Sequence, residues 1–442
     1  MMKPRLKAFS TFGLVALTSS AAFAEGGVSS ETAFIFNTFL FLVAGFLVMF
    51  MAAGFAMLEA GMVRSCSVVS ILIKNISLYA LAGTMFMLVG YNLMYMDVTG
   101  YIGTFAVWFS SDEAAAAGDF SAGYASSSDW FFQMVFVATA ASIVSGTLAE
   151  RIRVIPFLLF VAVLTGFIYP ITGSWKWGAG WLDQMGFQDF AGSTLVHSVG
   201  GWAALIGAIL LGPRVGRYVG SEPQDMPASS LPLVTLGTFI LWLGWFGFNG
   251  GSQLALGSAI DAIAVSNIFV NTNMAAAGGV LAALILTKLL AEVNLGMVLN
   301  GALGGLVSIT AEPLEPTIVE AFLIGAVGGA IVVYGTSFLE KVKIDDVVGA
   351  IPVHLFCGIW GTLIVPFTNE SANYATQLVG IAAIGAFVFV VSAVVWFTLK
   401  NTVGIRLSDE AQLKGADHNE FGTTAYPEFC PVPSTPKGKK GK

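Results

Sequence analysis

The sequence predicts an all-α polytopic membrane protein in which eleven transmembrane helices form an inverted repeat of five and five, plus one extra C-terminal helix. Three observations support this fold class. Of the 442 residues, 56% are hydrophobic and 11% are charged, and the mean hydropathy is +0.80, whereas about a quarter of the residues in a soluble domain are charged. Eleven apolar windows follow one another along the chain, and an Asp-x7-His motif occurs in two of the predicted helical segments.

The chain divides into three parts. Residues 1–24 combine a basic start, an apolar run from Phe12 to Leu17 and an Ala-Phe-Ala end at Ala24, which is typical of a cleavable signal peptide. Residues 25–400 hold the eleven windows, and residues 401–442 form a polar tail that ends in lysines and glycines. A cleaved signal peptide places the mature N-terminus outside, as in a bacterial inner membrane protein whose N-terminus is periplasmic.

The apolar windows give the helices in order. A spanning helix needs ~20 predominantly apolar residues, and only the eighth window is clearly short. The windows lie at residues 33–59, 67–94, 129–148, 154–173, 191–212, 231–251, 264–290, 295–311, 317–338, 348–367 and 375–399.

Charged residues predict which loops face the cytoplasm. Eleven helices that start outside end inside, so the tail is expected to be cytoplasmic, and short cytoplasmic loops are rich in lysine and arginine. Of the basic residues in and beside the predicted loops, only Lys176 falls on the outer side. Those on or beside the predicted inner side are Arg64, Arg151, Arg153, Arg214, Arg217, Lys288, Lys341, Lys343 and those from Lys400 onward. We expect the lipid bilayer as surroundings and no nucleic acid partner.

Two segments share an Asp-x7-His spacing. Asp189 precedes His197 in the fifth helix, and Asp346 precedes His354 in the tenth. The fifth helix enters from outside and the tenth from inside, and eight helical residues cover ~12 Å, close to half of the ~30 Å hydrocarbon core. Both histidines should therefore reach the midplane, where inverted repeats place their site.

The histidine pair favours a pore or a binding site. A lone buried histidine is usually a core imidazole bonded to a neighbouring helix, but ionisable groups within a membrane are costly and commonly functional. Burial disfavours the charged form, and two neutral rings offer a donor and an acceptor, which suits a small polar molecule better than a hydrated ion. Asp189 fits a helix cap and direct cation contact equally well, and the two roles are compatible, whereas Asp346 fits a cap or a salt-bridge partner.

Aromatic residues gather on the predicted outer side. Phe132 and Phe136 begin the third helix, Trp177 follows the fourth, and Phe248 and Ser252 end the sixth. Each alone fits the aromatic belt of a membrane interface. Together with the aspartate at the mouth of the fifth helix, they can form a vestibule, because a cation over a desolvated aromatic face gains ~2 kcal/mol or more.

At these residues the chain resembles the Amt family of ammonium transporters. The stretch from Asp189 to His197 is similar to the family signature, with Ser193 where a glycine is more usual. The resemblance covers nearly the whole mature chain, through Glu59–Arg64, Ala149–Arg153, Leu241–Asn249, Asn300–Thr310 and Asp345–Gly361.

The resemblance implies recruitment of ammonium outside, loss of a proton near a gate, and conduction of ammonia past two histidines. It implies a homotrimer with one pore per subunit, and a cytoplasmic tail that contacts a PII signalling protein of the GlnK type. The implied roles are a stacked gate for Phe136 and Phe248, outer recruitment for Phe132, Trp177 and Ser252, a twin-histidine conduction path for His197 and His354, and support of the recruitment site for Asp189.

The tail departs from the family pattern. Residues 414–426 keep its outline, but Ala416 stands where leucine is common, and Glu420 and Phe421 stand where Glu-His is common. These departures bear on coupling through the tail and on PII control rather than on conduction.

Three other function classes remain open. A sensor would bind ammonium in the same pore and signal through its tail, which a long folded domain after Asn401 would favour. A Na⁺-coupled transporter predicts unwound half-helices and intramembrane carboxylates, for which the sequence offers Glu59 and the mouth aspartates. A membrane enzyme is the third, but the sequence shows no nucleophile or metal set, so we expect neither enzymatic activity nor a cofactor.

Two smaller expectations concern single residue types. The three cysteines, Cys66, Cys357 and Cys430, have no metal-like spacing, so we expect no metal site and no disulfide framework. We expect Lys74, within the second helix, to snorkel toward the inner interface.

Overall fold

Helices form most of the computed structural model, which describes residues 28–428. The signal peptide predicted at residues 1–24 and the last residues of the tail lie outside the described residues. Short 3₁₀ or π-helical turns carry the label η. The elements up to residue 223 are α1 (Ser30–Met62), η1 (Ser65–Ser67), α2 (Val68–Met85), η2 (Phe86–Gly90), α3 (Tyr91–Tyr95), α4 (Glu113–Ala116), α5 (Ser126–Thr147), α6 (Val154–Val163), η3 (Leu164–Ile168), α7 (Tyr169–Lys176), α8 (Trp181–Gln184), η4 (Ser193–Ser198), α9 (Val199–Leu211), β1 (Tyr218–Val219) and β2 (Glu222–Pro223). The remaining elements are α10 (Leu231–Gly251), α11 (Ala259–Leu290), α12 (Leu295–Ile309), α13 (Ile318–Lys341), η5 (Ile351–Phe356), α14 (Cys357–Thr368), α15 (Tyr374–Thr402), α16 (Asp409–Lys414) and α17 (Ala416–Phe421).

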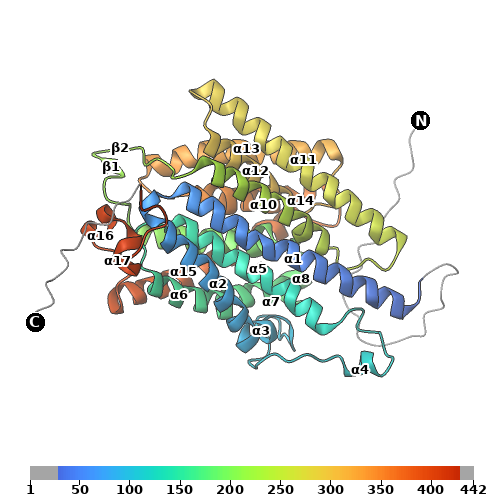
Figure 1. The fold of residues 1–442 in the computed structure, drawn as a ribbon. Coiled ribbons are helices and arrows are strands. Elements are labelled where there is room, and N and C mark those ends of the chain that lie inside the picture. The colour runs from blue at the N-terminus through green and yellow to red at the C-terminus, as the bar shows by residue number, and fades with distance from the viewer. Residues whose placement is uncertain (1–27, 429–442) are drawn as a thin grey trace, which may run out of the picture.

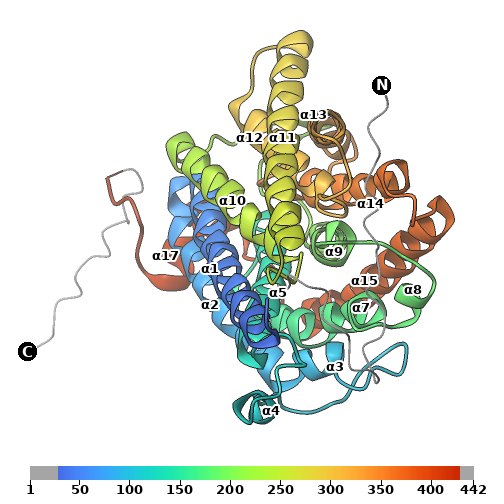
Figure 2. The same ribbon diagram turned by 90° about the vertical axis from the view of Figure 1, so that its right-hand side faces the viewer.

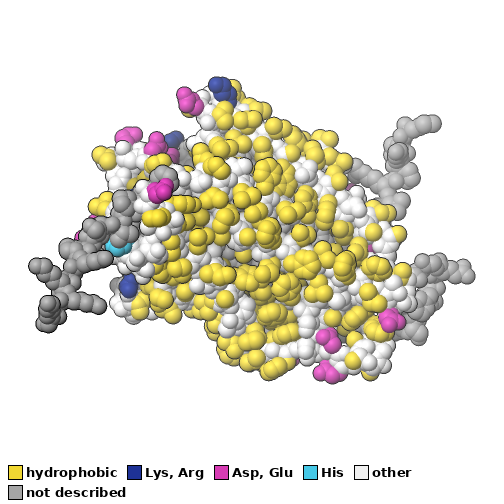
Figure 3. Space-filling model, in the orientation of Figure 1, with side chains coloured by type: hydrophobic (Ala, Val, Ile, Leu, Met, Phe, Trp, Pro, Cys, Tyr) yellow, Lys and Arg dark blue, Asp and Glu magenta, His cyan; other side chains and the backbone are white. Residues whose placement is uncertain are grey.

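Ten helical stretches of the described chain are long and apolar enough to cross a membrane, and they fall on ten of the eleven predicted windows. The eighth window forms α12, which has 15 residues. At ~1.5 Å per residue this helix covers ~22 Å, less than the ~30 Å hydrocarbon core. The multi-pass helical fold is therefore confirmed, but the count of eleven spans is not. Hydrophobic side chains cover the middle of the face in Figure 3, and charged ones lie toward its ends.

The short helix α12 lies within the protein rather than at its edge. It contacts α10, α11, α13 and α14, and its residues from Leu299 to Ile309 are all buried. A helix enclosed by other helices need not match the thickness of the lipid, because its surroundings are protein. Its neighbours α11 and α13 approach closely where Gly325 and Gly329 lie against the backbone carbonyls of Ala275 and Gly279, as small residues permit in membrane helices.

The helix α9 lies near the centre of the bundle (Figure 2) and contacts α5, α15, η4 and η5. The turns η4 and η5 contain the two histidines of the repeated motif. The fold therefore brings both motifs to the middle of the molecule.

A network of ion pairs lies next to the tail helix α16, whose Gln412 accepts from the amide of Val215 at 3.2 Å. Figure 1 shows α16 at one end of the bundle. Arg214 donates to both carboxylate oxygens of Asp345 at 2.9 and 3.0 Å and to Glu150 at 3.0 Å. Burial raises the pKa of Asp345, but the charges of Arg151 and Arg214 outweigh it and lower that pKa to about 2. Asp345 therefore has the salt-bridge role that the sequence left open for Asp346.

The described part of the tail folds back onto this end. Asp417 accepts hydrogen bonds from the backbone amides of Val69 and Ser70 at 2.9 and 2.7 Å, at the start of α2. Glu420 accepts from the amide of Val154 at 3.1 Å, at the start of α6. Both carboxylates complement the positive end of a helix dipole, so they hold the tail against α2 and α6.

Two of the smaller expectations are wrong. Lys74 does not snorkel: its side chain is fully buried, and its Nζ donates to the carbonyl oxygen of Ser145 at 2.9 Å. Cys66 is disulfide-bonded, although the scattered cysteines predicted no disulfide framework. Cys357 is free and buried.

Candidate functional site

The carboxylate of Asp189 caps the turn that carries His197. Its Oδ1 accepts from the amides of Gly192 and Ser193 at 3.1 and 2.8 Å, and its Oδ2 accepts from those of Thr194 and Leu195 at 2.9 and 2.8 Å. These are the donors that a helix start leaves without partners. The structure therefore shows the capping role expected for this residue.

Asp346 has a weaker version of the same role. Its Oδ2 accepts from the amide of Ile351, the first residue of η5, at 2.7 Å. The second motif therefore also starts with an aspartate that holds the beginning of the turn carrying its histidine. Asp346 is only partly buried, whereas Asp189 is fully buried.

Both histidines lie in π-helical turns. His197 belongs to η4 and His354 belongs to η5, each of six residues. Such turns are rare and are frequent at functional sites. The sequence did not predict them, because the Asp-x7-His spacing fits an ordinary α-helix equally well.

The two imidazoles contact each other directly. Nδ1 of His197 lies 3.1 Å from Nδ1 of His354, and the ring centroids are 5.2 Å apart with the planes at 18°. Both rings are buried. One Nδ1 must carry hydrogen and the other must not, because a hydrogen bond needs one donor and one acceptor. The expectation that the histidines lie within hydrogen-bonding reach is confirmed.

Aromatic rings enclose His197 on its other side. Trp245 stacks on it with centroids 5.0 Å apart, and Phe248 does so at 5.3 Å. The indole of Trp245 is fixed by a hydrogen bond to Thr310 at 2.8 Å. Nε2 of His197 is buried without a hydrogen-bond partner in the described part of the chain. It is therefore available to a small molecule beside the ring.

The predicted outer aromatics form one continuous group. Phe136 packs against Phe248 with ring centroids 4.1 Å apart and the planes tilted by 32°, and its ring lies 4.8 Å from that of Phe132 and 6.3 Å from that of Trp177. Ser252 ends the helix that carries Phe248 and donates to its carbonyl oxygen at 2.8 Å. The three phenylalanines are buried, while Trp177 and Ser252 are half-buried. The group thus runs from a more open end to a dry one.

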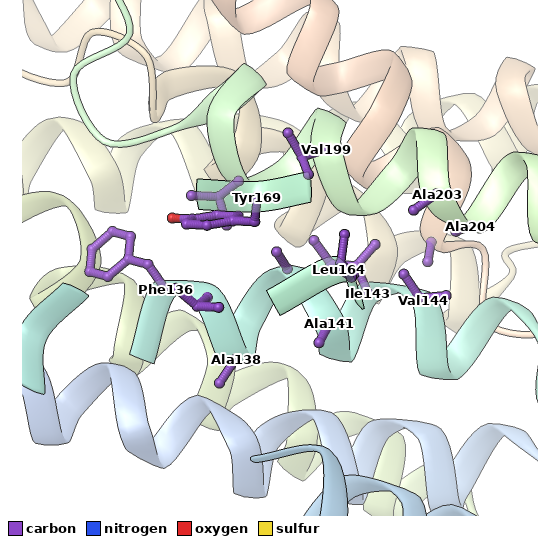
Figure 4. Close-up of a cluster of buried hydrophobic side chains, with 14 of the residues drawn as sticks. Phe136, Ala138, Ala141, Ile143, Val144, Leu164, Tyr169, Val199, Ala203 and Ala204 are labelled. Carbon is purple, nitrogen blue, oxygen red and sulfur yellow. The ribbon is translucent and has the colours of Figure 1, made fainter. Parts of the chain in front are cut away.

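Apolar side chains surround the region between this aromatic group and the opposite end of α5. Figure 4 shows the ring of Phe136 at one end of a cluster of buried side chains that α5, η3, α7 and α9 contribute. Trp177 also ties this group to the cap, because its Nε1 donates to the carbonyl oxygen of Asp189 at 3.0 Å. The eight residues singled out in the sequence therefore belong to one connected region.

A small cavity lies on the other side of the histidine pair. His354, Phe55, Glu59 and Asn300 are among its lining residues, and the ring of Phe55 lies 6.2 Å from that of His354. Sequence reasoning gave neither Phe55 nor Asn300 a role, although Asn300 begins one of the quoted motifs. No cluster of three potential metal ligands occurs within residues 28–428.

Comparison with known proteins links this geometry to one family. A model of the Ammonium Transporter Family matches residues 39–426. Ammonium transporter Amt2 of Archaeoglobus fulgidus is 40% identical over 421 residues, which cover 88% of this chain and 87% of that protein. Ammonium transporter Amt1 of Haloferax mediterranei is 38% identical over 418 residues, which cover 88% and 78%.

Two solved structures share the arrangement of helices. A protein named Sensor Amt Protein superposes with a TM-score of 0.82 at 34% identity, over 89% of this chain and all of that one. Mep2 of Candida albicans superposes with a TM-score of 0.78 over 92% of this chain and 94% of that one. At 24% identity, the second likeness concerns the fold alone.

Proposed function

Because the chain belongs to the Ammonium Transporter Family, we propose that it recruits ammonium at the outer aromatic group, removes a proton there, and conducts ammonia past His197 and His354. Transport of ammonium follows from the family, whereas the path through these residues is our proposal. The observation that carries it is the 3.1 Å contact between two buried imidazoles, one of which packs against the closely packed pair of Phe136 and Phe248.

The outer group suits recruitment of a cation. Trp177 and Ser252 are half-buried, so a small cation can reach them before it meets the buried phenylalanines. A cation over a partly desolvated indole gains ~2 kcal/mol. The carboxylate of Asp189 is occupied by four amides, so we assign it to shaping this end of the site rather than to binding the cation.

The interior suits a neutral molecule better than an ion. The rings of Phe136 and Phe248 close the path. Beyond them, the imidazole nitrogens of His197 and His354 are the only polar groups among the residues that we assign to the path. Moving an intact cation through such surroundings carries the cost of any unpaired buried charge. Ammonia can instead donate to or accept from an imidazole nitrogen, which makes loss of the proton near the phenylalanines the favourable course.

Flux measurements on purified protein in liposomes test this function. We expect uptake and current with ammonium, and none with K⁺ or Na⁺ alone. Equal conduction of K⁺ and ammonium would contradict the dry-path proposal, and absence of ammonium transport would contradict the function itself.

The assembly and the partner are proposals from the family resemblance. We propose a homotrimer with one pore per subunit, which mass measurement in detergent can check. We also propose that a PII protein of the GlnK type contacts the end of the bundle that holds the tail. Binding of a purified PII protein to the full chain, compared with a chain truncated after Asn401, tests that contact.

A further inference from the structure

A buried polar cluster joins α1, α2 and α5 on the side of the histidines away from the phenylalanines. Ser145 donates to Oε2 of Glu59 at 2.7 Å, and Asn75 donates to the same oxygen at 3.2 Å. Lys74 donates to the carbonyl oxygen of Ser145 at 2.9 Å. A glutamate and a lysine are therefore both hydrogen-bonded to one serine, Glu59 through the serine hydroxyl and Lys74 through the serine carbonyl oxygen, and the conduction path described so far uses neither.

Glu59 faces the cavity that begins at His354. Both residues line it, together with Phe55, Asn300 and several apolar side chains. Glu59 is 1% exposed, and its Oε1 has no hydrogen-bond partner among the described residues. One carboxylate oxygen is thus anchored, and the other is left for whatever occupies the cavity.

The position of Glu59 in its helix also favours a cation there. It lies three residues before Met62, the last residue of α1, and the C-terminal end of a helix carries partial negative charge that attracts cations. Arg64, whose side chain is 30% exposed, lies five positions further along the chain. At ~1.5 Å per helical residue, the carboxyl group is roughly 8 Å or less from the end of the bundle.

We propose that Glu59 is a proton-transfer site at the inner end of the path, where ammonia that has passed His354 becomes ammonium again. This proposal rests on the proposed function. Ammonia takes the proton of the Glu59 carboxylic acid: the O–H bond breaks, an N–H bond forms, and ammonium and a carboxylate result. The carboxylate then takes a proton from hydronium in the aqueous phase at that end, and the charge of Lys74 stabilises it meanwhile.

The competing explanation is that Glu59 only ties three helices together. Glutamine distinguishes the two, because its amide oxygen can still accept from Ser145 and Asn75 but cannot deliver a proton. The titratable groups around Glu59 are Lys74 on α2 and His354 on η5, and the charges of Arg151 and Glu420 act in turn on Lys74. The other polar groups at the cluster and cavity, Ser142, Ser145, Asn75 and Asn300, do not titrate.

The test compares the full-length protein with Glu59→Gln in liposomes, recording ammonium flux while the pH on the Glu59 side is varied. We expect Glu59→Gln to lower the flux by about tenfold or more, since a positioned acid contributes roughly 10² to 10⁴ in rate. We also expect it to remove the dependence on that pH, and Glu59→Asp to restore part of both. The exposed Glu222 of β2 provides the control Glu222→Gln, which should match the wild type.

If Glu59→Gln keeps its ammonium flux within about twofold of the wild type and shows the same pH profile, the proposal is overturned while ammonium transport itself stands. If the wild type transports no ammonium, the proposed function fails first. Should Glu59→Gln fail to fold, Ser145→Ala takes its place, because it removes one donor to Oε2 without entering the acid itself. That variant should displace the pH profile, and an unchanged profile would overturn the proposal equally.

Discussion

Removing the carboxylate of Asp189 should damage the fold before it damages any contact with the cation. In Asp189→Ala, four amides that are buried at the start of η4 lose their acceptor. A buried donor without a partner costs ~1–3 kcal/mol, so the four together cost roughly 4–12 kcal/mol. A water molecule in the vacated space can satisfy some of them, which brings the loss toward the lower figure. Even that is comparable with the ~5–15 kcal/mol of total stability of a typical domain.

Two comparison variants make this reasoning quantitative. Asp189→Asn keeps one oxygen but turns an NH₂ group toward the remaining amides, so it should lose about half as much. Asp346→Ala removes the acceptor of one amide, that of Ile351, and should cost ~1 kcal/mol, as loss of an N-cap does.

The assay is thermal unfolding of each variant in detergent, with the ammonium flux expressed per folded molecule. An Asp189→Ala protein as stable as the wild type but inactive would refute the reasoning, since it would mean that the carboxylate acts on the cation. Equal, small losses in Asp189→Ala and Asp346→Ala would refute it as well.

Three further predictions concern the path and the ion-pair network. The acidic replacements His197→Asp and His354→Glu should admit K⁺ or Na⁺, because a carboxylate supplies charge and hard oxygen ligands, whereas His197→Leu should lower ammonium flux without admitting metal ions. Liposome currents recorded with each cation alone test this, and acidic variants that do not conduct K⁺ would count against it. Trp177→Leu should raise the half-saturating ammonium concentration by about 30-fold, the equivalent of ~2 kcal/mol of cation–π energy. Trp177→Phe keeps an aromatic ring and should raise that concentration less. An unchanged half-saturating concentration in the leucine variant would exclude recruitment by the indole. Asp345→Asn should lower the free energy of unfolding by ~3–5 kcal/mol, because Arg214 loses a buried partner. Since the pKa of Asp345 falls from 3.8 to about 2 on folding, the stability that its charge contributes is present above pH 3.8 and is lost as the pH falls toward 2. The unfolding free energies of wild type and variant should therefore converge near pH 2. A difference between them that does not change with pH would contradict the ion-pair role of Asp345.

The repeated motif predicted more of the site than any other feature of the sequence. Two aspartate-to-histidine segments of opposite direction led to the expectation that His197 and His354 meet, and their Nδ1 atoms lie 3.1 Å apart. Hydropathy located ten of the spanning helices because burial in lipid demands long apolar runs. The same rule does not apply to α12, because its surroundings are other helices. Its short apolar window therefore did not show whether it spans the membrane.

Features that depend on three-dimensional neighbours were beyond the sequence. A lysine eight residues into a helix can snorkel or turn inward, and only the position of Ser145 shows that Lys74 turns inward. A mouth aspartate can cap or bind a cation, and only the four amide distances show that Asp189 caps. Pairing across the fold likewise shows that Asp345, rather than Asp346, meets Arg214. In each case the residue type allows more than one partner, and the packing shows which partner within the protein it has.

The two aspartates also explain why the histidines are placed so closely. Asp189 accepts four backbone amides and Asp346 accepts one at the start of a π-helical turn, so the path of the backbone is fixed before the imidazole is reached. A π-helical turn holds more residues than an α-helical one, which turns the side chains that follow to a different side of the helix. Two such turns, approaching from opposite ends of the fold, can therefore direct both rings to one point without a polar network around them. Fixing the imidazoles through the backbone leaves Nε2 of His197 without a hydrogen-bond partner among residues 28–428, which is what the proposed passage of ammonia along the two rings requires.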